Sequence, residues 1–401
     1  MAQGDRKRIL FVSPRYGVEV NGGAEMECRA YAEHLTGRFD VSVLTTCAVD
    51  HMTWKNEYKP GCETLNGVSV IRVENARERR QDTFGAYIAR VMNPDHSHED
   101  EVTFIDKQGP YCPELIKYLQ AHKGEYDAVI FVTYLYYHVI YGTPIDGVVK
   151  ILIPTVHDEW AAHLGVIQDV FRNVDGYIYN TDEEKQFADR QYPGAAEKPS
   201  CTVGFGIEVP EADALPDVKA KYGINNYIMY AGRIEEAKGC GHLFTYFQQF
   251  KRHHPSDLKL VLCGKSGMDI PPGGDIISLG FVSEEDKYAL MKDAKVFVLA
   301  SQFESLSIVV LEAMMMGTPV LVNGECEVLK GHCLKSNAGL YFSNYTQFER
   351  TLTWLLTHPE EYRQMQHNGK AYVGAQYRWP IIEQKIGDLV EGLIEARRGT
   401  E

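Results

Sequence analysis

Two glutamates, Glu304 and Glu312, are separated by seven residues in a stretch that runs from a loop into an apolar helical segment. Glu304 falls in the loop, where it can face a ligand at the mouth of the helix, and Glu312 follows about two turns later. Carboxylates accept hydrogen bonds from paired hydroxyls such as those of a ribose or a hexose. We therefore predict that these glutamates bind sugar hydroxyls, whereas either one alone is typical of an exposed helix residue.

The backbone at the start of this expected helix offers a place for a phosphate. The N–H groups of about Leu306, Ser307 and Ile308 belong to the first turn, where they have no intrahelical acceptor. The partial positive charge of a helix N-terminus also favours an anion. A phosphate lying between the two glutamates can therefore rest on these three residues.

Two cations, Arg233 and Lys238, follow a short apolar run at residues 227–230. Ligands of α/β proteins bind at the carboxyl ends of strands. The planar guanidinium and the point-like ammonium together suit a diphosphate. We predict a diphosphate site at this turn; the alternative is a pair of surface cations in a loop.

The amino-terminal half carries weaker signals after two of its apolar runs. Gly22 and Gly23 stand where a helical pattern begins, and glycine lets a backbone approach a ligand closely. Such a doubled glycine is as often structural, and the turn departs from the G-x-G-x-x-G of nicotinamide and flavin sites. His157 follows the run at residues 149–153, and a lone histidine there is weak evidence for a site.

Short apolar runs alternate with longer helical patterns, and this series starts twice. The expected strands are residues 9–12, 41–44, 68–73, 128–132, 149–153 and 176–179, and then 227–230, 258–263, 276–279, 296–299 and 319–323. Continuously apolar strands separated by helices indicate parallel sheets covered on both faces. We therefore predict an α/β protein of two Rossmann-like, doubly wound domains that face each other across a cleft.

Three further segments complete the expected organisation. A stretch with four prolines at residues 192–220 marks the change of domain. Apolar residues at helical spacing predict a last helix over residues 380–397. Residues 76–113 fit neither pattern; their run of histidines and acidic residues is consecutive rather than spaced around an ion, so we expect a mobile solvated loop and not a metal site.

The composition excludes several classes of protein. A net charge of −14 over 401 residues argues against a nucleic-acid-binding protein, which needs a broad basic surface. We recognise no secretory signal and no run of roughly 20 apolar residues that could span a membrane. We expect a cytoplasmic protein, for which a local basic patch leaves open a peripheral contact with the inner face of the membrane.

Taken together, these motifs resemble the signature of the retaining nucleotide-sugar glycosyltransferases of the GT-B architecture, the glycosyl transferases group 1 family. The resemblance rests on Glu304 and Glu312 with Gly317-Thr318-Pro319-Val320, and on Gly232-Arg233 with Lys238-Gly239. It covers nearly the whole chain, because Gly22-Gly23 resembles the family's amino-terminal glycine loop and Gly280-Phe281-Val282 its base-recognition loop.

The resemblance implies a role for each of these residues. Arg233 and Lys238 would hold the donor diphosphate, Glu304 would contact the transferred sugar, and His157 would lie beside that sugar; these four are the expected catalytic residues. The expected donor-binding residues are Gly22, Gly23, Gly232, Val282, Leu306, Ser307, Ile308 and Glu312. Within this set, Glu312 would bind the ribose and Val282 the base.

The resemblance also implies a reaction and a division of labour. A hexose would pass from a nucleoside-diphosphate sugar to a hydroxyl of a carbohydrate or lipid-linked acceptor, with retention, in the assembly of surface polysaccharide or another glycoconjugate. No cofactor and no metal ion is expected, because the two cations would take the metal's place. Residues 1–205 with a returning helix at 380–401 would form the acceptor domain, and residues 206–379 the donor domain. The base, the sugar, the acceptor and the oligomeric state stay open.

One departure from the family and two rival functions qualify this interpretation. The family often has Pro-Phe-Gly after the first glutamate, whereas this chain has Ser305-Leu306-Ser307, which keeps the backbone N–H but narrows the space at the sugar.

Residues 108–113 and 134–137 are candidate acceptor-side elements; the alternative is that they belong to the core and to a loop. The rivals are a GT-B sugar-nucleotide epimerase, which needs acid–base groups but no acceptor, and a non-catalytic nucleotide-sugar-binding protein.

Overall fold

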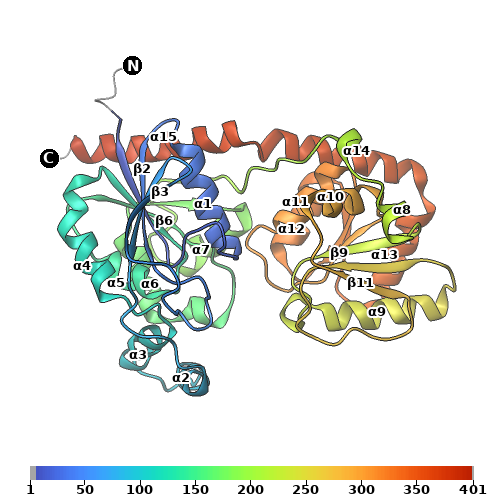
Figure 1. Cartoon of the computed structure of the whole chain (residues 1–401), viewed down its shortest axis with the longest axis horizontal. Coiled ribbons are helices and arrows are strands. Elements are labelled where there is room, and N and C mark those ends of the chain that lie inside the picture. The colour runs from blue at the N-terminus through green and yellow to red at the C-terminus, as the bar shows by residue number, and fades with distance from the viewer. Residues whose placement is uncertain (1–5, 400–401) are drawn as a thin grey trace. The chain divides into compact units, whose positions relative to one another are not determined.

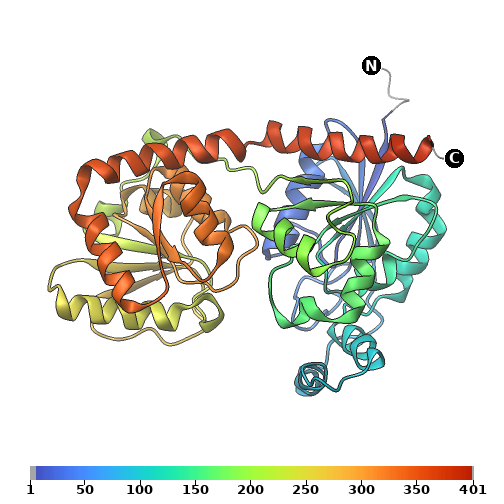
Figure 2. The ribbon, with the colours of Figure 1, turned by 180° about the vertical axis from the view of Figure 1, so that it is seen from behind.

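The chain divides into two compact units in the computed structural model, which describes residues 6–399. Unit 1 holds the chain up to Gly204 together with the segment from Pro380 onward, and unit 2 holds Phe205–Trp379. Each unit is a sheet with helices on both faces, blue to green for most of unit 1 and yellow-green to orange for most of unit 2 (Figures 1 and 2). The expected α/β class with two Rossmann-like sheets is confirmed.

The sheet of unit 1 has eight strands in the order β3-β4-β2-β1-β5-β6-β7-β8. All neighbours are parallel except β3 and β4, an edge hairpin whose two turn residues, Asn66 and Gly67, both have positive φ. The strands are β1 (Arg8–Val12), β2 (Asp40–Thr46), β3 (Gly61–Leu65), β4 (Val68–Val73), β5 (Ala128–Val132), β6 (Val149–Ile153), β7 (Gly176–Tyr179) and β8 (Ser200–Thr202).

Helices cover both faces of this sheet because its central strands are apolar on both sides. Leu10 and Val12 of β1 share a core cluster with residues of α4, α5 and α6, while Ile9 and Phe11 are buried toward the opposite face, which α1 covers. The helices are α1 (Gly23–Leu35), α2 (Gln81–Val91), α3 (His98–Gln108), α4 (Pro113–His122), α5 (Tyr137–Gly142), α6 (Gly165–Asn173), α7 (Asp182–Gln191) and α15 (Trp379–Arg398).

The structure corrects the expected loop at residues 76–113. This segment forms α2 and α3, which pack against each other (Figure 1). Ser97 caps α3 through a capping box, in which its side chain accepts from the Asp100 N–H and the Asp100 carboxylate accepts from the Ser97 N–H. The acidic run is therefore the first turn of a helix, where negative charge is favourable. Over residues 6–399 no cluster of His, Cys, Asp or Glu side chains is arranged to hold a metal ion.

The last helix, α15, belongs to unit 1 from Pro380 onward. Its apolar face is buried at Ile382, Ile386, Val390 and Ile394. Arg38, after α1, binds two of its carboxylates, Glu391 at 2.7 Å and Asp388 at 2.8 Å. No helix within the described part of the chain is long and apolar enough to cross a membrane.

The sheet of unit 2 has six strands, all parallel, in the order β11-β10-β9-β12-β13-β14. From β9 the chain builds outward through β10 to β11, and from β12 it builds in the other direction through β13 to β14. The strands are β9 (Tyr227–Ala231), β10 (Lys259–Cys263), β11 (Ile276–Gly280), β12 (Phe297–Leu299), β13 (Val320–Asn323) and β14 (Gly339–Phe342). The strand order therefore reverses between β9 and β12.

Helices cover both faces of the second sheet as well. Helices α10, α11 and α12 lie over one face, and α9 and α13 over the other (Figure 1). The helices are α8 (Val218–Tyr222), α9 (Cys240–His253), α10 (Glu284–Asp293), α11 (Ile308–Met316), α12 (Glu327–Ser336), α13 (Tyr345–Thr357) and α14 (Pro359–Gln376).

Two buried glutamates stand between α1 and the end of β7 in unit 1. Glu27 of α1 accepts a hydrogen bond from the Asn180 amide at 3.2 Å, and Glu184 of α7 accepts from the backbone N–H groups of Asn180 and Val156. Burial raises the pKa of Glu27 to about 7 and that of Glu184 to about 8. Between about pH 4.5 and pH 7, these two carboxyls therefore retain their protons in the folded protein, whereas in the unfolded chain they have released them.

Replacing Ile386 by alanine should lower the free energy of unfolding of unit 1 by about 2–5 kcal/mol, because it opens a cavity under α15. Gln384→Ala changes an exposed residue of the same helix and should shift it by less than about 0.5 kcal/mol. Urea unfolding with limited proteolysis measures both. Equal protease resistance of unit 1 in the two variants would show that α15 contributes nothing to its stability.

The stability of unit 1 should also depend on the charge of Glu27. Because its pKa is raised in the folded state, the folded form retains its proton while the unfolded form ionises, so stability falls as pH rises from about 4.5 to 7. Glu27→Gln should gain on the order of 3 kcal/mol relative to the parent between pH 5 and pH 8. Glu33→Gln, a more exposed change on the same helix, is the control. Parallel pH profiles for parent and Glu27→Gln would contradict the assignment.

Candidate functional site

The carboxyl edge of the unit 2 sheet collects most of the residues that the sequence analysis singled out. Arg233 and Lys238 follow β9, and Glu304 follows β12, the neighbouring strand on the other side of the strand-order reversal. Since all strands are parallel, their carboxyl ends meet at one edge. In open α/β sheets, such a topological switch point is where ligands bind.

Lys238 and Glu304 form an ion pair across this switch point. The Lys238 Nζ lies 2.8 Å from the Glu304 Oε1, and the two side chains are 26% and 14% exposed. The next residue, Gly239, has φ 71° and comes so close to the turn after β12 that a Cβ on it would lie 2.2 Å from the Ala300 carbonyl oxygen. Only glycine fits there, so backbone packing and an ion pair both join the two loops.

Arg233 lies directly after β9, as expected, with its side chain at the surface. Its side chain is 65% exposed and pairs with Glu235 at 3.1 Å, not with Glu304. Its backbone is fixed, because its carbonyl accepts the Tyr230 hydroxyl at 2.6 Å. The structure therefore holds the Gly232–Arg233 turn in place while the guanidinium lies at the surface, where it can reorient at little cost.

The start of α11 is strained at the residue where the family often has glycine. Ser307, the N-cap, has φ 65° and ψ 69°, a left-handed conformation that a non-glycine residue rarely adopts. Its hydroxyl is buried without a hydrogen-bond partner among the described residues. The first-turn N–H groups of Ile308 and Val309 lie directly beyond this residue, as helix geometry requires.

A buried histidine that the sequence analysis did not identify holds this strained turn. The His332 Nε2 lies 2.8 Å from the Leu306 carbonyl oxygen, and its Nδ1 lies 3.0 Å from the Tyr372 hydroxyl. Burial lowers the pKa of His332 to about 4, so the ring is neutral at pH 7. Because a carbonyl only accepts, Nε2 carries the proton and Nδ1 accepts from Tyr372.

Glu312 lies further along α11, where α10 supplies two partners that were also not predicted. Its Oε1 accepts from the Lys287 ammonium at 3.0 Å and from the Tyr288 hydroxyl at 2.8 Å. Its Oε2 is buried and has no hydrogen-bond partner within the described residues. Burial raises the pKa of Glu312. Because Oε2 has no partner, this desolvated carboxyl can still accept a hydrogen bond from a ligand.

The expected base-recognition loop follows β11 at the same edge of the sheet. Gly280 ends the strand, Phe281 is 88% exposed and Val282 is half-buried against the core of unit 2. The structure therefore places Val282 directly after β11, at the carboxyl edge of the unit 2 sheet.

The candidates of unit 1 lie on their own sheet and are held by partners of their own. Gly22 caps α1, and the turn before it is fixed by Arg15, whose guanidinium pairs with Glu25 at 2.6 Å and also donates to the Asn21 carbonyl at 3.2 Å. Gly23 begins the helix and is exposed. This loop is therefore rigid, with an open backbone at its tip.

His157 stands after β6, with its Nε2 3.5 Å from the Glu159 carboxylate. The same carboxylate accepts a short hydrogen bond from the buried Tyr134, a member of the aromatic run at residues 134–137. The histidine side chain is 29% exposed. The Glu159 carboxylate thus lies beside the imidazole and is itself hydrogen-bonded to Tyr134.

The strain at Ser307 predicts an ordering of variants. Ser307→Val should lower the free energy of unfolding of unit 2 by about 1–3 kcal/mol, since a β-branched residue is disfavoured at this φ. Ser307→Gly should change it by less than about 1 kcal/mol, because relief of strain offsets the greater freedom of the unfolded chain. Ser278→Val, in the exposed part of β11, is the control and should be tolerated. A Ser307→Val protein as stable as Ser307→Gly would refute the strained geometry.

A family model and several curated proteins match parts of this chain. Residues 211–372 match the model of the glycosyl transferases group 1 family. YtcC of Bacillus subtilis, named as a glycosyltransferase, is 26% identical over 199 residues, which are 44% of this chain and 48% of that protein. The chain spans less than half the length of the curated relatives it matches first.

Solved structures share the architecture at low sequence identity. Sucrose-phosphate synthase from Thermosynechococcus elongatus has a TM-score of 0.71 at 18% identity and covers 98% of this chain and 100% of its own. HepE of Anabaena, crystallised with UDP and glucose, has a TM-score of 0.67 at 16% identity, with 96% and 100% covered. Residues 211–372 thus match the glycosyl transferases group 1 family, and the chain as a whole shares the GT-B fold of these structures.

Proposed function

We propose that the protein is a retaining glycosyltransferase that moves a hexose from a nucleoside-diphosphate sugar to a hydroxyl of a carbohydrate or lipid-linked acceptor. The observation that carries this proposal is the Lys238–Glu304 pair at the switch point of unit 2, beside the first turn of α11. A cation, a carboxylate and free backbone N–H groups together match a diphosphate joined to a sugar.

In this proposal the diphosphate binds to Lys238 and to the N–H groups that open α11. The exposed Arg233 turns from Glu235 toward the same phosphates, which its position after β9 allows. Lys238 then contacts the phosphate in place of part of its contact with Glu304. The Glu304 carboxylate accepts hydrogen bonds from hydroxyls of the transferred sugar. The ion pair is thus the resting arrangement of two groups that both serve the donor.

Glu312 is proposed to bind the ribose. Lys287 and Tyr288 hold its Oε1, so its Oε2 is the oxygen left for a ligand hydroxyl. That oxygen is covered in this structure, and ribose binding therefore requires a small shift of the residues over it. A hydroxyl donor would stabilise a buried oxygen that otherwise lacks a hydrogen bond.

The chemistry follows from charge on the leaving group. When the bond between the sugar and the diphosphate breaks, negative charge grows on the phosphate next to Lys238, Arg233 and the α11 N-terminus, and these preorganised groups stabilise it. An oxygen of the departing diphosphate takes the proton of the attacking hydroxyl, so the bond forms on the same face and configuration is retained. In unit 1, the resemblance implies that Gly22 and Gly23 approach the diphosphate or the acceptor and that His157 lies beside the transferred sugar, and we keep these roles in the proposal.

Two solved structures of similar fold contain a uridine nucleotide. HepE of Anabaena is in complex with UDP and glucose, and a trehalose-6-phosphate structure from E. coli is bound with UDP-2-fluoro glucose. We propose that this protein also uses a UDP-sugar. A thermal-shift series with UDP, GDP, ADP and TDP tests the proposal, since a ligand at 100 times its Kd stabilises the folded state by about 2.7 kcal/mol. Absence of stabilisation by all four would contradict the proposed nucleoside-diphosphate-sugar donor.

Variants then separate the proposed roles. Lys238→Ala should lower turnover by about 10²–10³-fold, because it removes a preorganised cation from the leaving group. Glu312→Gln should chiefly weaken UDP binding, and Glu304→Gln should chiefly lower turnover, because only the latter group faces the sugar. Lys219→Ala, an exposed lysine of α8, is the control for charge. Calorimetry with UDP measures the difference; equal loss of UDP affinity in both glutamate variants would contradict this division.

A further inference from the structure

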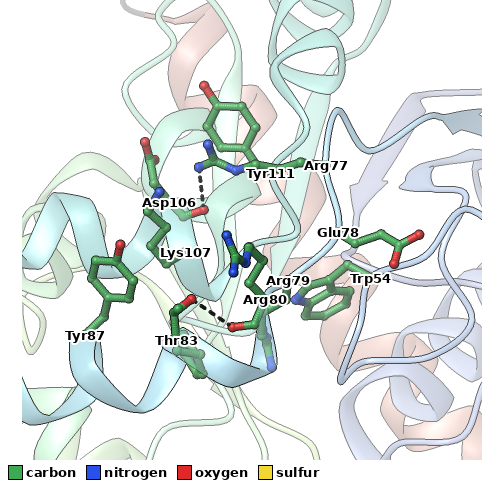
Figure 3. Close-up of a pocket in the computed structure, with 12 residues that line it drawn as sticks. Trp54, Arg77, Glu78, Arg79, Arg80, Thr83, Tyr87, Asp106, Lys107 and Tyr111 are labelled. Atoms are coloured by element: carbon green, nitrogen blue, oxygen red, sulfur yellow. Dashed lines mark hydrogen bonds between the residues drawn. The ribbon is translucent and has the colours of Figure 1, made fainter.

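A pocket of about 370 Å³ lies in unit 1, far along the sequence from the residues proposed to bind the donor. Its walls come from the turn after β2, the segment after β4, α2, and the end of α3 (Figure 3). The turns after β2 and β4 stand at the carboxyl edge of the unit 1 sheet, which is where α/β sheets bind ligands. The segment that the sequence analysis expected to be a loop therefore builds a cavity.

The pocket combines arginines with aromatic rings. Figure 3 shows Trp54 and Tyr87 on opposite sides of it, with Arg77 beside Tyr111. The Arg77 guanidinium lies 3.7 Å from the centre of the Tyr111 ring, and the Arg79 guanidinium lies 5.2 Å from the Trp54 ring. Aromatic faces hold these cations in place, leaving guanidinium edges for a ligand.

One cation of the pocket, Arg80, pairs with Asp82 at 2.8 Å, and the other cations have no carboxylate partner among the described residues. Arg77, Arg79 and Lys107 form no ion pair with any described residue, in a protein whose net charge is −14. Their hydrogen bonds go to backbone carbonyls: Arg77 donates to Asp106 at 3.0 Å, and Arg79 donates to Gln108 at 2.6 and 2.9 Å. Two carboxylates, Glu78 and Asp106, also line the pocket, and Asp106 accepts the Tyr141 hydroxyl at 2.8 Å.

Arg79 is a partly buried cation with one nitrogen that is left without a hydrogen bond among the described residues. Burial lowers its pKa to about 10, so it is still charged at pH 7 but poorly solvated. Its Nη1 makes no hydrogen bond within the described part of the chain, while Nε and Nη2 are both used. A partly buried cation without a counter-ion is unfavourable unless an anion joins it.

We propose that this pocket binds the oxyanion group of an acceptor saccharide, a phosphate or a carboxylate carried on a sugar ring. The planar guanidinium edges match both oxyanions, and the aromatic walls provide the apolar surface on which a sugar ring can lie. The proposal rests on the proposed function, since it names the chemical class of the acceptor. The two sources of the oxyanion are a phosphorylated sugar and a uronic acid.

The test compares three sugars that differ only in this group. Glucose, glucose 6-phosphate and glucuronate are titrated into the full-length protein by calorimetry, with and without saturating UDP, which fills the proposed donor site. At least one anionic sugar should bind about tenfold or more tightly than glucose, with or without UDP, and its affinity should fall as salt is raised. The sugar that binds more tightly identifies the source of the oxyanion.

Matched variants show whether the pocket is the site. Arg77→Gln and Arg79→Gln should each weaken binding of the preferred anionic sugar by about tenfold or more and leave glucose unchanged. Arg90→Gln removes the same charge from α2 outside the pocket, where it pairs with Asp100 at 2.7 Å, and should have no effect. The exposed Arg77 serves as the second probe if Arg79→Gln lowers the melting temperature.

Two results would overturn the proposal. One is a protein that binds no anionic sugar more tightly than glucose. The other is a preference that persists in both Arg77→Gln and Arg79→Gln. Failure of the proposed function is seen separately, as the absence of stabilisation by any nucleotide, and the pocket is judged on sugar binding in either case.

Discussion

The ion pair between Lys238 and Glu304 joins the loops that follow β9 and β12, the two strands between which the strand order of the unit 2 sheet reverses. Two neighbouring parallel strands whose following helices lie on opposite faces must leave a gap at their carboxyl ends. Here the gap is bordered by a lysine from one side and a carboxylate from the other, and Gly239 lets the two backbones approach. The positions of Arg233, α11 and Glu312 all depend on this junction, because each belongs to an element that starts there.

The start of α11 shows how the fold keeps such a junction open to a ligand. Ser307 occupies a conformation that its side chain disfavours, and such strain persists only where the surroundings enforce it. His332 holds this conformation because its Nε2–H donates to the Leu306 carbonyl. Tyr372 donates to Nδ1 and so fixes the tautomer in which Nε2 carries the proton. The N–H groups of the first turn are thereby aimed outward by a buried, uncharged hydrogen-bond network rather than by surface charge.

Much of the fold followed from periodicity, because apolar strands of a parallel sheet stand out in a sequence. The edge strands β3 and β8 lie outside the expected series, although Asn66-Gly67 is a strong hairpin signal for β3. Helices α2 and α3 stand where the sequence pattern predicts a loop, because their exposed faces are polar; the capping box at Ser97 is the local signal for the start of α3. The partners of Glu312 and of Leu306 come from α10 and α12, and no local pattern announces contacts that only tertiary packing creates.

The central claim is that a nucleoside diphosphate binds at the β9–β12 switch point of unit 2. A crystal structure of the protein with UDP tests it most directly. The account predicts the diphosphate at the N-terminus of α11, with the Lys238 Nζ and the N–H groups of Ile308 and Val309 within hydrogen-bond distance, roughly 2.7–3.2 Å. A structure with UDP bound elsewhere, while Lys238 stays paired with Glu304 and the α11 N-terminus contacts no phosphate, would contradict it.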